Sequence, residues 1–98
     1  MSKEKNELKV IHLKEKNRFE IHVDEQVAEL DYRLRNDVIT FTHTGVPRAL
    51  EGGGIGSRIV RAGLDYAREQ EYKVVPLCSF VSAYIRRHEE YSDLLKSN

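Results

Sequence analysis

A cluster of glycines near the middle of the chain most constrains what it can fold into. Four glycines fall within the five residues 52–56 of the run Leu50-Glu51-Gly52-Gly53-Gly54-Ile55-Gly56-Ser57. A β-type alternation precedes them at 38–43, and helical periodicity follows over 55–70. The first N–H groups of a helix have no internal partner and lie at the positive end of its dipole, and glycines leave them uncovered. The run therefore predicts a backbone cradle for phosphate groups, with an exposed turn that binds nothing as the alternative.

Two familiar phosphate motifs do not fit this run. A P-loop continues with Lys and then Ser or Thr, whereas Ile55 stands directly after Gly54. A dinucleotide fingerprint has a third small residue where this chain has Ile59. A chain of 98 residues is also too short for the repeated βαβ units of a doubly wound sheet. Candidate side-chain partners for a polyanion are Arg48, Arg58 and Arg61.

Length and charge limit the class of protein. With 98 residues the chain can form one domain, which we assign to 8–98, after a flexible N-terminal tail at 1–7. Sixteen basic and sixteen acidic residues cancel, which argues against a general nucleic-acid binder. One cysteine excludes an internal disulfide, and no apolar run reaches the roughly 18 residues of a membrane span. We therefore expect a cytoplasmic protein with no nucleic-acid or membrane partner, and the oligomeric state stays open.

The hydrophobic pattern changes period once along the chain. Apolar and polar residues alternate over 10–13, 19–23, 28–34 and 38–43, which predicts an antiparallel four-stranded meander. The glycine-rich turn then leads into a long helix over 55–70 that covers the sheet, and 73–78 is expected to form a fifth strand parallel to the fourth. A closing C-terminal helix is expected at 80–88, with a further helical turn at 91–96. The predicted fold class is α+β.

Pro76 lies inside the predicted fifth strand. Proline has no N–H for a sheet ladder, so hydrogen bonding between this strand and a neighbour is expected to fail there. A gap of this kind beside a phosphate-binding helix start would admit an extended ligand. The alternative is that Pro76 lies on an edge of the sheet.

This order of elements resembles the Gcn5-related N-acetyltransferase (GNAT) superfamily, in its minimal single-domain branch. The family's acetyl-CoA signature is Gln or Arg, two residues, Gly, one residue, then Gly or Ala, and residues 51–56 fit it except at the first position. The resemblance covers about 19–91. Its other motifs are His43-Thr44-Gly45-Val46-Pro47, Val74-Val75-Pro76-Leu77-Cys78 and Ala83-Tyr84-Ile85-Arg86-Arg87-His88.

The resemblance implies a GNAT-like fold and acetyl-CoA as co-substrate, with the pyrophosphate on the amides of 52–56 and the pantetheine arm between the fourth and fifth strands. Branch members often carry Glu where this chain has Gly45, and Lys where it has Gly53. The first departure removes a candidate base, and the second weakens phosphate binding. The residues expected to bind the cofactor are Val46, Glu51, Gly52, Gly53, Gly54, Ile55, Gly56, Ser57, Arg58, Cys78, Tyr84 and Arg87.

Acetyl transfer to an amine requires a base, because an amine with a pKa of about 10.4 is mostly protonated at neutral pH. His43 is the candidate if the family geometry holds, and a half-exposed strand residue bonded to the adjacent loop is the alternative. By analogy with relatives, Tyr84 would protonate the departing CoA thiolate, unless it is a core aromatic. Cys78 could be a nucleophile, a proton donor or a buried packing residue. The run Arg86-Arg87-His88 could contact the 3′-phosphate or an acidic acceptor, or lie on a solvated helix face.

No His, Cys, Asp and Glu grouping has metal-ligand spacing, so no metal is expected, and His12 and His22 are expected to be surface or hydrogen-bonded residues. The preferred function is an acetyl-CoA-dependent N-acetyltransferase. Its acceptor would be an amine-bearing small molecule or protein, which the sequence does not identify. One alternative is an acyl-CoA-binding or sensing module with weak or no transferase activity. Another is an interaction domain whose glycine turn binds nothing.

Overall fold

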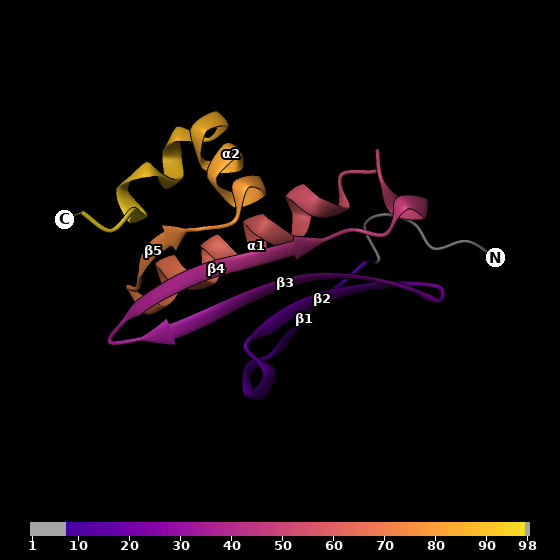
Figure 1. Cartoon of the computed structure of the whole chain (residues 1–98), viewed down its shortest axis with the longest axis horizontal. Helices are drawn as coiled ribbons and strands as arrows, with labels where there is room; N and C mark the ends of the chain where they lie inside the picture. Colours follow the sequence, from indigo (N-terminus) through magenta and orange to yellow (C-terminus); the bar gives the residue numbers. More distant parts are fainter. Residues whose placement is uncertain (1–7, 98) are drawn as a thin grey trace.

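The protein is a five-stranded sheet with its helices on one side (Figure 1). The structure is a computed structural model that describes residues 8–97. The elements are β1 Val10–Leu13, η2 Lys14–Lys16, β2 Arg18–Val23, β3 Gln26–Arg35, β4 Val38–Gly45, η3 Arg48–Leu50, α1 Ile55–Gln70, β5 Lys73–Pro76, α2 Ser79–Arg87 and η4 Glu89–Leu94. The expected tail at 1–7 lies outside the described residues. No helix in the described range is long and apolar enough to cross a membrane.

The sheet has the predicted topology. Its strand order is β1-β2-β3-β4-β5; the first four strands pair antiparallel, and β5 pairs parallel to β4. Two-residue turns close the β2–β3 and β3–β4 hairpins, and Asp24, Asn36 and Asp37 take the positive φ values that such turns require. The α+β meander followed by a parallel crossover is therefore confirmed.

The predicted boundaries need small corrections at six elements. β2 begins one residue earlier than the predicted 19–23, and β4 extends two residues beyond the predicted 38–43. β3 is longer than the predicted 28–34, and β5 ends at Pro76, not at 78. The closing helix is Ser79–Arg87, one residue earlier than predicted, because Cys78 is already its N-cap. The final turn is the 3-10 segment Glu89–Leu94, two residues earlier than the expected 91–96. The long helix Ile55–Gln70 has the predicted bounds.

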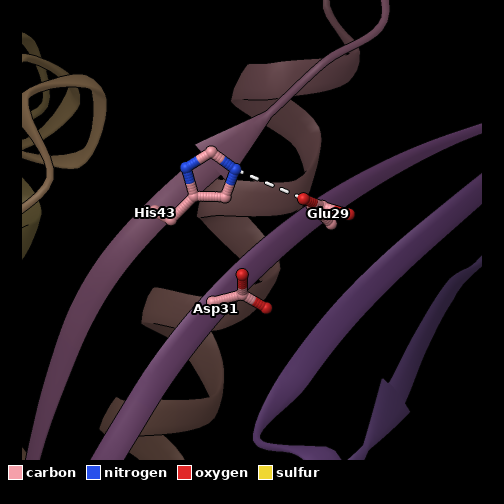
Figure 2. A group of neighbouring side chains, drawn as sticks. All are labelled: Glu29, Asp31 and His43. Atoms are coloured by element: carbon pink, nitrogen blue, oxygen red, sulfur yellow. Dashed lines mark ion pairs between the residues drawn. The ribbon is translucent and has the colours of Figure 1, made fainter.

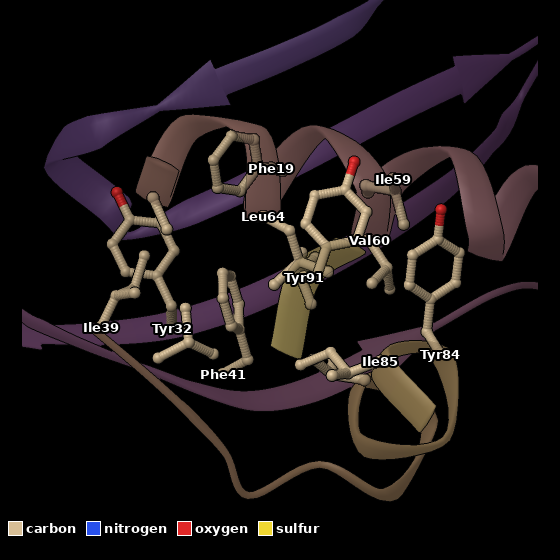
Figure 3. Close-up of a cluster of buried hydrophobic side chains, with 14 of the residues drawn as sticks. Phe19, Tyr32, Ile39, Phe41, Ile59, Val60, Leu64, Tyr84, Ile85 and Tyr91 are labelled. Atoms are coloured by element: carbon tan, nitrogen blue, oxygen red, sulfur yellow. The ribbon is translucent and has the colours of Figure 1, made fainter. Parts of the chain in front are cut away.

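A single apolar core lies between the sheet and the helices (Figure 3). Inward-facing side chains of β2, β3, β4 and β5 meet the apolar stripe of α1 and residues of α2 and η4. The helix approaches the sheet closely at Gly63, where a Cβ would lie 2.7 Å from Leu30 Cδ2 and 3.0 Å from Phe41 Cε1. At the core margin, His12 stacks on Phe19 and its Nε2 lies 2.7 Å from Tyr32 Oη, so its expected hydrogen bonding is confirmed.

The opposite side of the sheet, called the open face below, carries no helix within residues 8–97. The buried apolar side chains of α1, α2 and η4 belong to one core cluster with the inward-facing side chains of the strands, which places these elements on the other side. Open-face residues of the central strands are half-buried or exposed; they include Arg18, Glu20, Glu29, Asp31 and Arg33. His22 is exposed there and its Nε2 lies 2.7 Å from Glu20 Oε1, which confirms a surface, hydrogen-bonded histidine.

A β-bulge in β4 changes which side chains face the helices. Tyr32 pairs with Phe41 and Asp31 pairs with His43, so Thr42 has no partner in β3. Without the bulge, His43 would share the face of Phe41, because side chains alternate along a strand. The extra residue instead turns His43 to the open face and Thr44 to the helix face. The bulge was not predicted from the sequence.

Candidate functional site

The glycine turn leaves the start of α1 open. Gly52 and Gly54 have φ values of 88° and 82°, and no atom lies within 4 Å of a Cβ built at either position. Gly54 is the N-cap and makes no side-chain cap hydrogen bond. Its carbonyl accepts the first helical hydrogen bond from the Arg58 N–H at 3.0 Å. The amides of the first turn therefore point out of the helix without a side-chain cap, as an anion site requires.

Two cavities lie on either side of this turn. The β4–α2 cavity, of about 560 Å³, is lined by Thr44, Val46, Leu50, Glu51, Gly52, Gly54, Ile55, Gly56, Ser57, Phe80 and Arg87. The α1–α2 cavity, of about 660 Å³, is lined by Val10, Gly53, Gly54, Ser57, Arg58, Arg61, Ala62, Asp65, Tyr84 and His88. Gly54 and Ser57 line both cavities. Every residue expected to bind the cofactor lines one of them, except Cys78.

The strands β4 and β5 separate next to the β4–α2 cavity. Their pairing runs from Val38 and Lys73 to Phe41 and Pro76, and one further bond joins the Cys78 N–H to the Phe41 carbonyl at 2.9 Å. Beyond this point β4 continues to Gly45 without a strand partner on that side in the described chain. The predicted end of the ladder at Pro76 is confirmed, and β5 is also an edge strand of the sheet.

Cys78 lies where the two strands separate, and Thr44 is its neighbour across the gap. Its Sγ is 3.3 Å from Thr44 Oγ1. Burial on its own would raise the pKa of the thiol. The Thr44 hydroxyl and the amides of Val81, Phe80 and Thr44 favour the thiolate and together outweigh burial, so the pKa of Cys78 is lowered. The thiol is therefore more readily ionised than an ordinary cysteine.

His43 lies on the open face, on the other side of the sheet from Thr44. Its side chain is 57% exposed, and its Nε2 lies 3.2 Å from Glu29 Oε2 (Figure 2). Glu29, Asp31 and His43 bring their ligand atoms within 4.8 Å of one another, which is close enough to hold a metal ion. Sequence spacing missed this group because two strands contribute to it. Arg18 pairs with both carboxylates of this group, with Nε 2.6 Å from Asp31 Oδ1 and Nη1 3.4 Å from Glu29 Oε1.

Tyr84 lies apart from the other two candidate catalytic residues. It is buried, lines the α1–α2 cavity and stacks on His88 with ring centroids 3.9 Å apart. Burial is the main reason why the pKa of its hydroxyl is raised. Cys78, His43 and Tyr84 therefore occupy three different places: the strand gap, the open face and the α1–α2 cavity.

The sequence argument missed several residues of the site. Thr44, Leu50 and Phe80 line the β4–α2 cavity, and Asp65 lines the other, together with Arg61 and His88, which were predicted as possible anion contacts. Phe80 is 42% exposed, and its ring lies over the helix start, where a Cβ on Gly56 would be 2.7 Å from Cζ. The sequence gives no signal for this contact, because Phe80 is 24 residues from Gly56 and the two meet only through the packing of α2. Glu29 gave no signal because its partner His43 is 14 residues away.

Known proteins resemble this chain over most of its length. Residues 18–94 match the family model described as GCN5-related N-acetyl-transferase. Over 85 residues the chain is 25% identical to Protein NATD1 of Mus musculus, covering 83% of this chain and 76% of that protein. For Protein NATD1 of Homo sapiens the identity is also 25%, with 83% and 74% covered.

A solved structure supports the same assignment. The NMR structure of a GCN5-like protein from Staphylococcus aureus has a TM-score of 0.73 and 32% identity, and covers 93% of this chain and 90% of that one. The chain belongs to the GCN5-related N-acetyltransferase family. Its fold is therefore a GNAT fold, and membership supports N-acetyltransferase activity in general terms.

Proposed function

We propose that the protein binds acetyl-CoA and transfers its acetyl group to an amine. The proposal rests on two features that join: the unpaired edge of β4 beyond Phe41 and the uncapped start of α1. The β4 edge leads into the β4–α2 cavity, and that cavity ends at the start of α1. One extended ligand with a pyrophosphate at one end and an amide-containing arm at the other fits both features, because the arm can form strand-like hydrogen bonds.

The glycine turn would hold the phosphates mainly through the backbone. The amides of 52–56 and the dipole of α1 supply the attraction, and Arg58 and Arg87 line the two adjoining cavities. This arrangement supports binding despite the glycine at position 53. Tyr84 shares its cavity with Arg58, so contact with the cofactor fits its position better than protonation of a thiolate near Cys78.

The acetyl end of the ligand would lie near Thr44 and Cys78, in the strand gap. His43 would accept a proton from an amine that approaches on the open face, and the neutral amine would attack the thioester carbonyl. Cys78 could relay the second amine proton to the departing CoA thiolate. Its lowered pKa equally supports a two-step transfer through an acetylated Cys78.

A second candidate function is an acyl-CoA-binding or sensing module with weak or no transferase activity. The open face favours it, because no element of the described chain covers His43 or encloses an acceptor. Such a module would bind acetyl-CoA as tightly as an enzyme but would consume it no faster than the Cys78→Ala/His43→Ala double variant.

Calorimetric titration with acetyl-CoA, desulfo-CoA and ATP tests the site. Binding of the two CoA compounds and not of ATP supports it, and a ligand that binds only the folded state should also raise the unfolding temperature. Mass spectrometry of spermidine and of a lysine peptide after incubation with acetyl-CoA then separates enzyme from sensor. No binding at millimolar acetyl-CoA would overturn both functions and leave an interaction domain.

A further inference from the structure

We propose that Glu29 is a positioning residue that orients His43 as the base of the transfer reaction. The inference rests on the proposed function, and it adds a residue that the sequence pattern did not single out. It depends on three local features: the bulge in β4, the missing side chain at Gly45 and the arginine that holds the carboxylate. Each can be altered separately.

The bulge brings Glu29 and His43 to the same face. In the register of β3 and β4, Asp31 lies opposite His43 and Glu29 lies opposite Gly45. Because paired residues share a face, His43 and both carboxylates lie together on the open face, while Thr44 pairs with the buried Leu30. Consecutive residues of β4 therefore line the two sides of the strand gap: Thr44 beside Cys78, and His43 on the side open to an acceptor.

Gly45 provides the room in which the two groups meet. A Cβ at this position would lie 3.0 Å from His43 Nε2, 3.2 Å from Glu29 Oε2 and 3.3 Å from Glu29 Cγ. These separations are shorter than ordinary van der Waals contact, so a side chain at position 45 would push both groups aside. The absence of an acidic residue at position 45 is thus matched by a carboxylate that arrives from the neighbouring strand.

Arg18 holds the Glu29 carboxylate through Oε1, the oxygen that does not face His43. Its Nη1 lies 3.4 Å from Glu29 Oε1, while its Nε and Nη2 lie 2.6 Å and 3.3 Å from the two oxygens of Asp31. Glu29 therefore has Oε2 directed to His43 and Oε1 directed to Arg18 (Figure 2 shows the first contact). A held carboxylate restricts the rotation of an exposed imidazole, which otherwise has little to fix it.

The chemistry follows from which ring nitrogen faces Glu29. Nε2 turned toward the carboxylate carries the ring proton, so Nδ1 keeps its lone pair and points away from Glu29 (Figure 2). Nδ1 accepts one proton from the ammonium form of the acceptor, and Glu29 stabilises the resulting imidazolium. The amine nitrogen bonds to the acetyl carbon, the carbon–sulfur bond breaks, and the second amine proton goes to the CoA thiolate. His43 then releases its proton to water.

A matched pair on the same face provides the control. Glu20 contacts His22 as Glu29 contacts His43, so Glu20→Leu removes the same charge from the open face without touching the base. Glu20 Oε2 also lies 3.5 Å from Arg18 Nη1, but in this variant Arg18 keeps its two bonds to Asp31 and its contact with Glu29. With spermidine as the acceptor probe, Glu29→Leu should lower kcat about 10- to 100-fold through mispositioning of the base. The KM for acetyl-CoA should stay within about twofold. Glu29→Gln should fall between Glu29→Leu and the unaltered protein, and Glu20→Leu should match the unaltered protein.

A double variant of His43 and Glu29 distinguishes a positioning role of Glu29 from a merely structural one. If Glu29 acts through His43, then His43→Ala and His43→Ala/Glu29→Leu should have the same kcat. Gly45→Ala should lower kcat as Glu29→Leu does, because it displaces the imidazole. Equal kcat values for Glu29→Leu and Glu20→Leu would overturn the inference, provided that the unaltered protein binds acetyl-CoA. Failure of the unaltered protein to bind acetyl-CoA would overturn the proposed function instead.

A side-chain NMR measurement decides the case in which acetyl-CoA binds but spermidine is not acetylated. The ¹⁵N shifts of the His43 ring report which nitrogen carries the proton and whether the ring is held. Loss of the single Nε2–H form in Glu29→Leu, with the His22 signals unchanged, would support the positioning contact. Identical His43 signals in Glu29→Leu and the unaltered protein would refute it.

Discussion

Two glycines of α1 allow a direct test of how the helix packs and how that packing shapes the site. A Cβ added at Gly63 would lie 2.7 Å from Leu30 Cδ2, and one added at Gly56 would lie 2.7 Å from Phe80 Cζ. The two clashes are equally close, but the neighbours differ. Leu30 is fully buried under the helix, whereas Phe80 is 42% exposed and can rotate toward solvent.

The expected free-energy changes follow from this difference. Gly63→Ala gains about 1 kcal/mol of helix propensity, but overpacking of a closed core costs about 1–3 kcal/mol. The net loss is up to about 2 kcal/mol, and each kcal/mol lowers the unfolding temperature of a domain this size by about 4–8 °C. For Gly56→Ala the ring of Phe80 yields, so the free energy of unfolding should change by less than about 0.5 kcal/mol.

The functional effect should run in the opposite order. The displaced ring of Phe80 moves within the β4–α2 cavity, so Gly56→Ala should weaken acetyl-CoA binding, and Gly63→Ala should not. Adding Phe80→Leu to Gly56→Ala should restore binding. Thermal unfolding followed by circular dichroism measures the stability of each variant, and calorimetric titration measures its affinity for acetyl-CoA. If Gly56→Ala unfolds at a lower temperature than Gly63→Ala, the argument from Phe80 exposure is wrong.

Three further changes have defined outcomes. Thr44→Val removes a hydroxyl that favours the thiolate, so the pKa of Cys78 should rise; the pH midpoint of iodoacetamide alkylation measures it, and an unmoved midpoint would contradict the contact. Arg87→Ala should weaken acetyl-CoA binding about tenfold by calorimetry, whereas Arg86→Ala, whose residue does not line the cavity, should not. Burial, helped by a nearby lysine, lowers the pKa of His12 in the folded protein, so the unfolded chain binds more protons below its usual pKa of about 6.5. The free energy of unfolding should therefore fall as the pH drops from about 6.5 toward the folded-state pKa, and His12→Gln should flatten this dependence in urea titrations.

The elements of this fold were predictable because each has a local pattern. Alternation gave the four antiparallel strands, and the 3.6-residue period gave α1 with its bounds. Pro76 marked the end of the β4–β5 ladder for the same reason, since a missing N–H is a property of one residue. The glycine run likewise gave the uncapped helix start, because positive φ at Gly52 and Gly54 is a local requirement.

The arrangement of the candidate catalytic side chains was not predictable in this way. Strict alternation along β4 places His43 on the same face as Phe41, and the single unpaired residue Thr42 reverses this. A bulge depends on how two strands match over their whole length, and no residue type at 42 specifies it. The contacts of Cys78 with Thr44 and of His43 with Glu29 both follow from the reversal.

The bulge also accounts for how so small a domain could serve two substrates. If β4 kept Thr42 in regular pairing, His43 would turn to the helix side, where Thr44 and Cys78 now lie, and the proposed cofactor and acceptor would compete for space there. With Thr42 inserted, Thr44 lies beside Cys78 on the side of the gap proposed for the cofactor, and His43 lies on the side proposed for the acceptor. Deletion of Thr42 removes the extra residue but keeps His43 opposite Asp31 and Thr44 opposite Leu30, so His43 should stay on the open face, and transfer and acetyl-CoA binding should both persist. Loss of transfer with acetyl-CoA binding retained would contradict the argument that the bulge acts by setting these two faces.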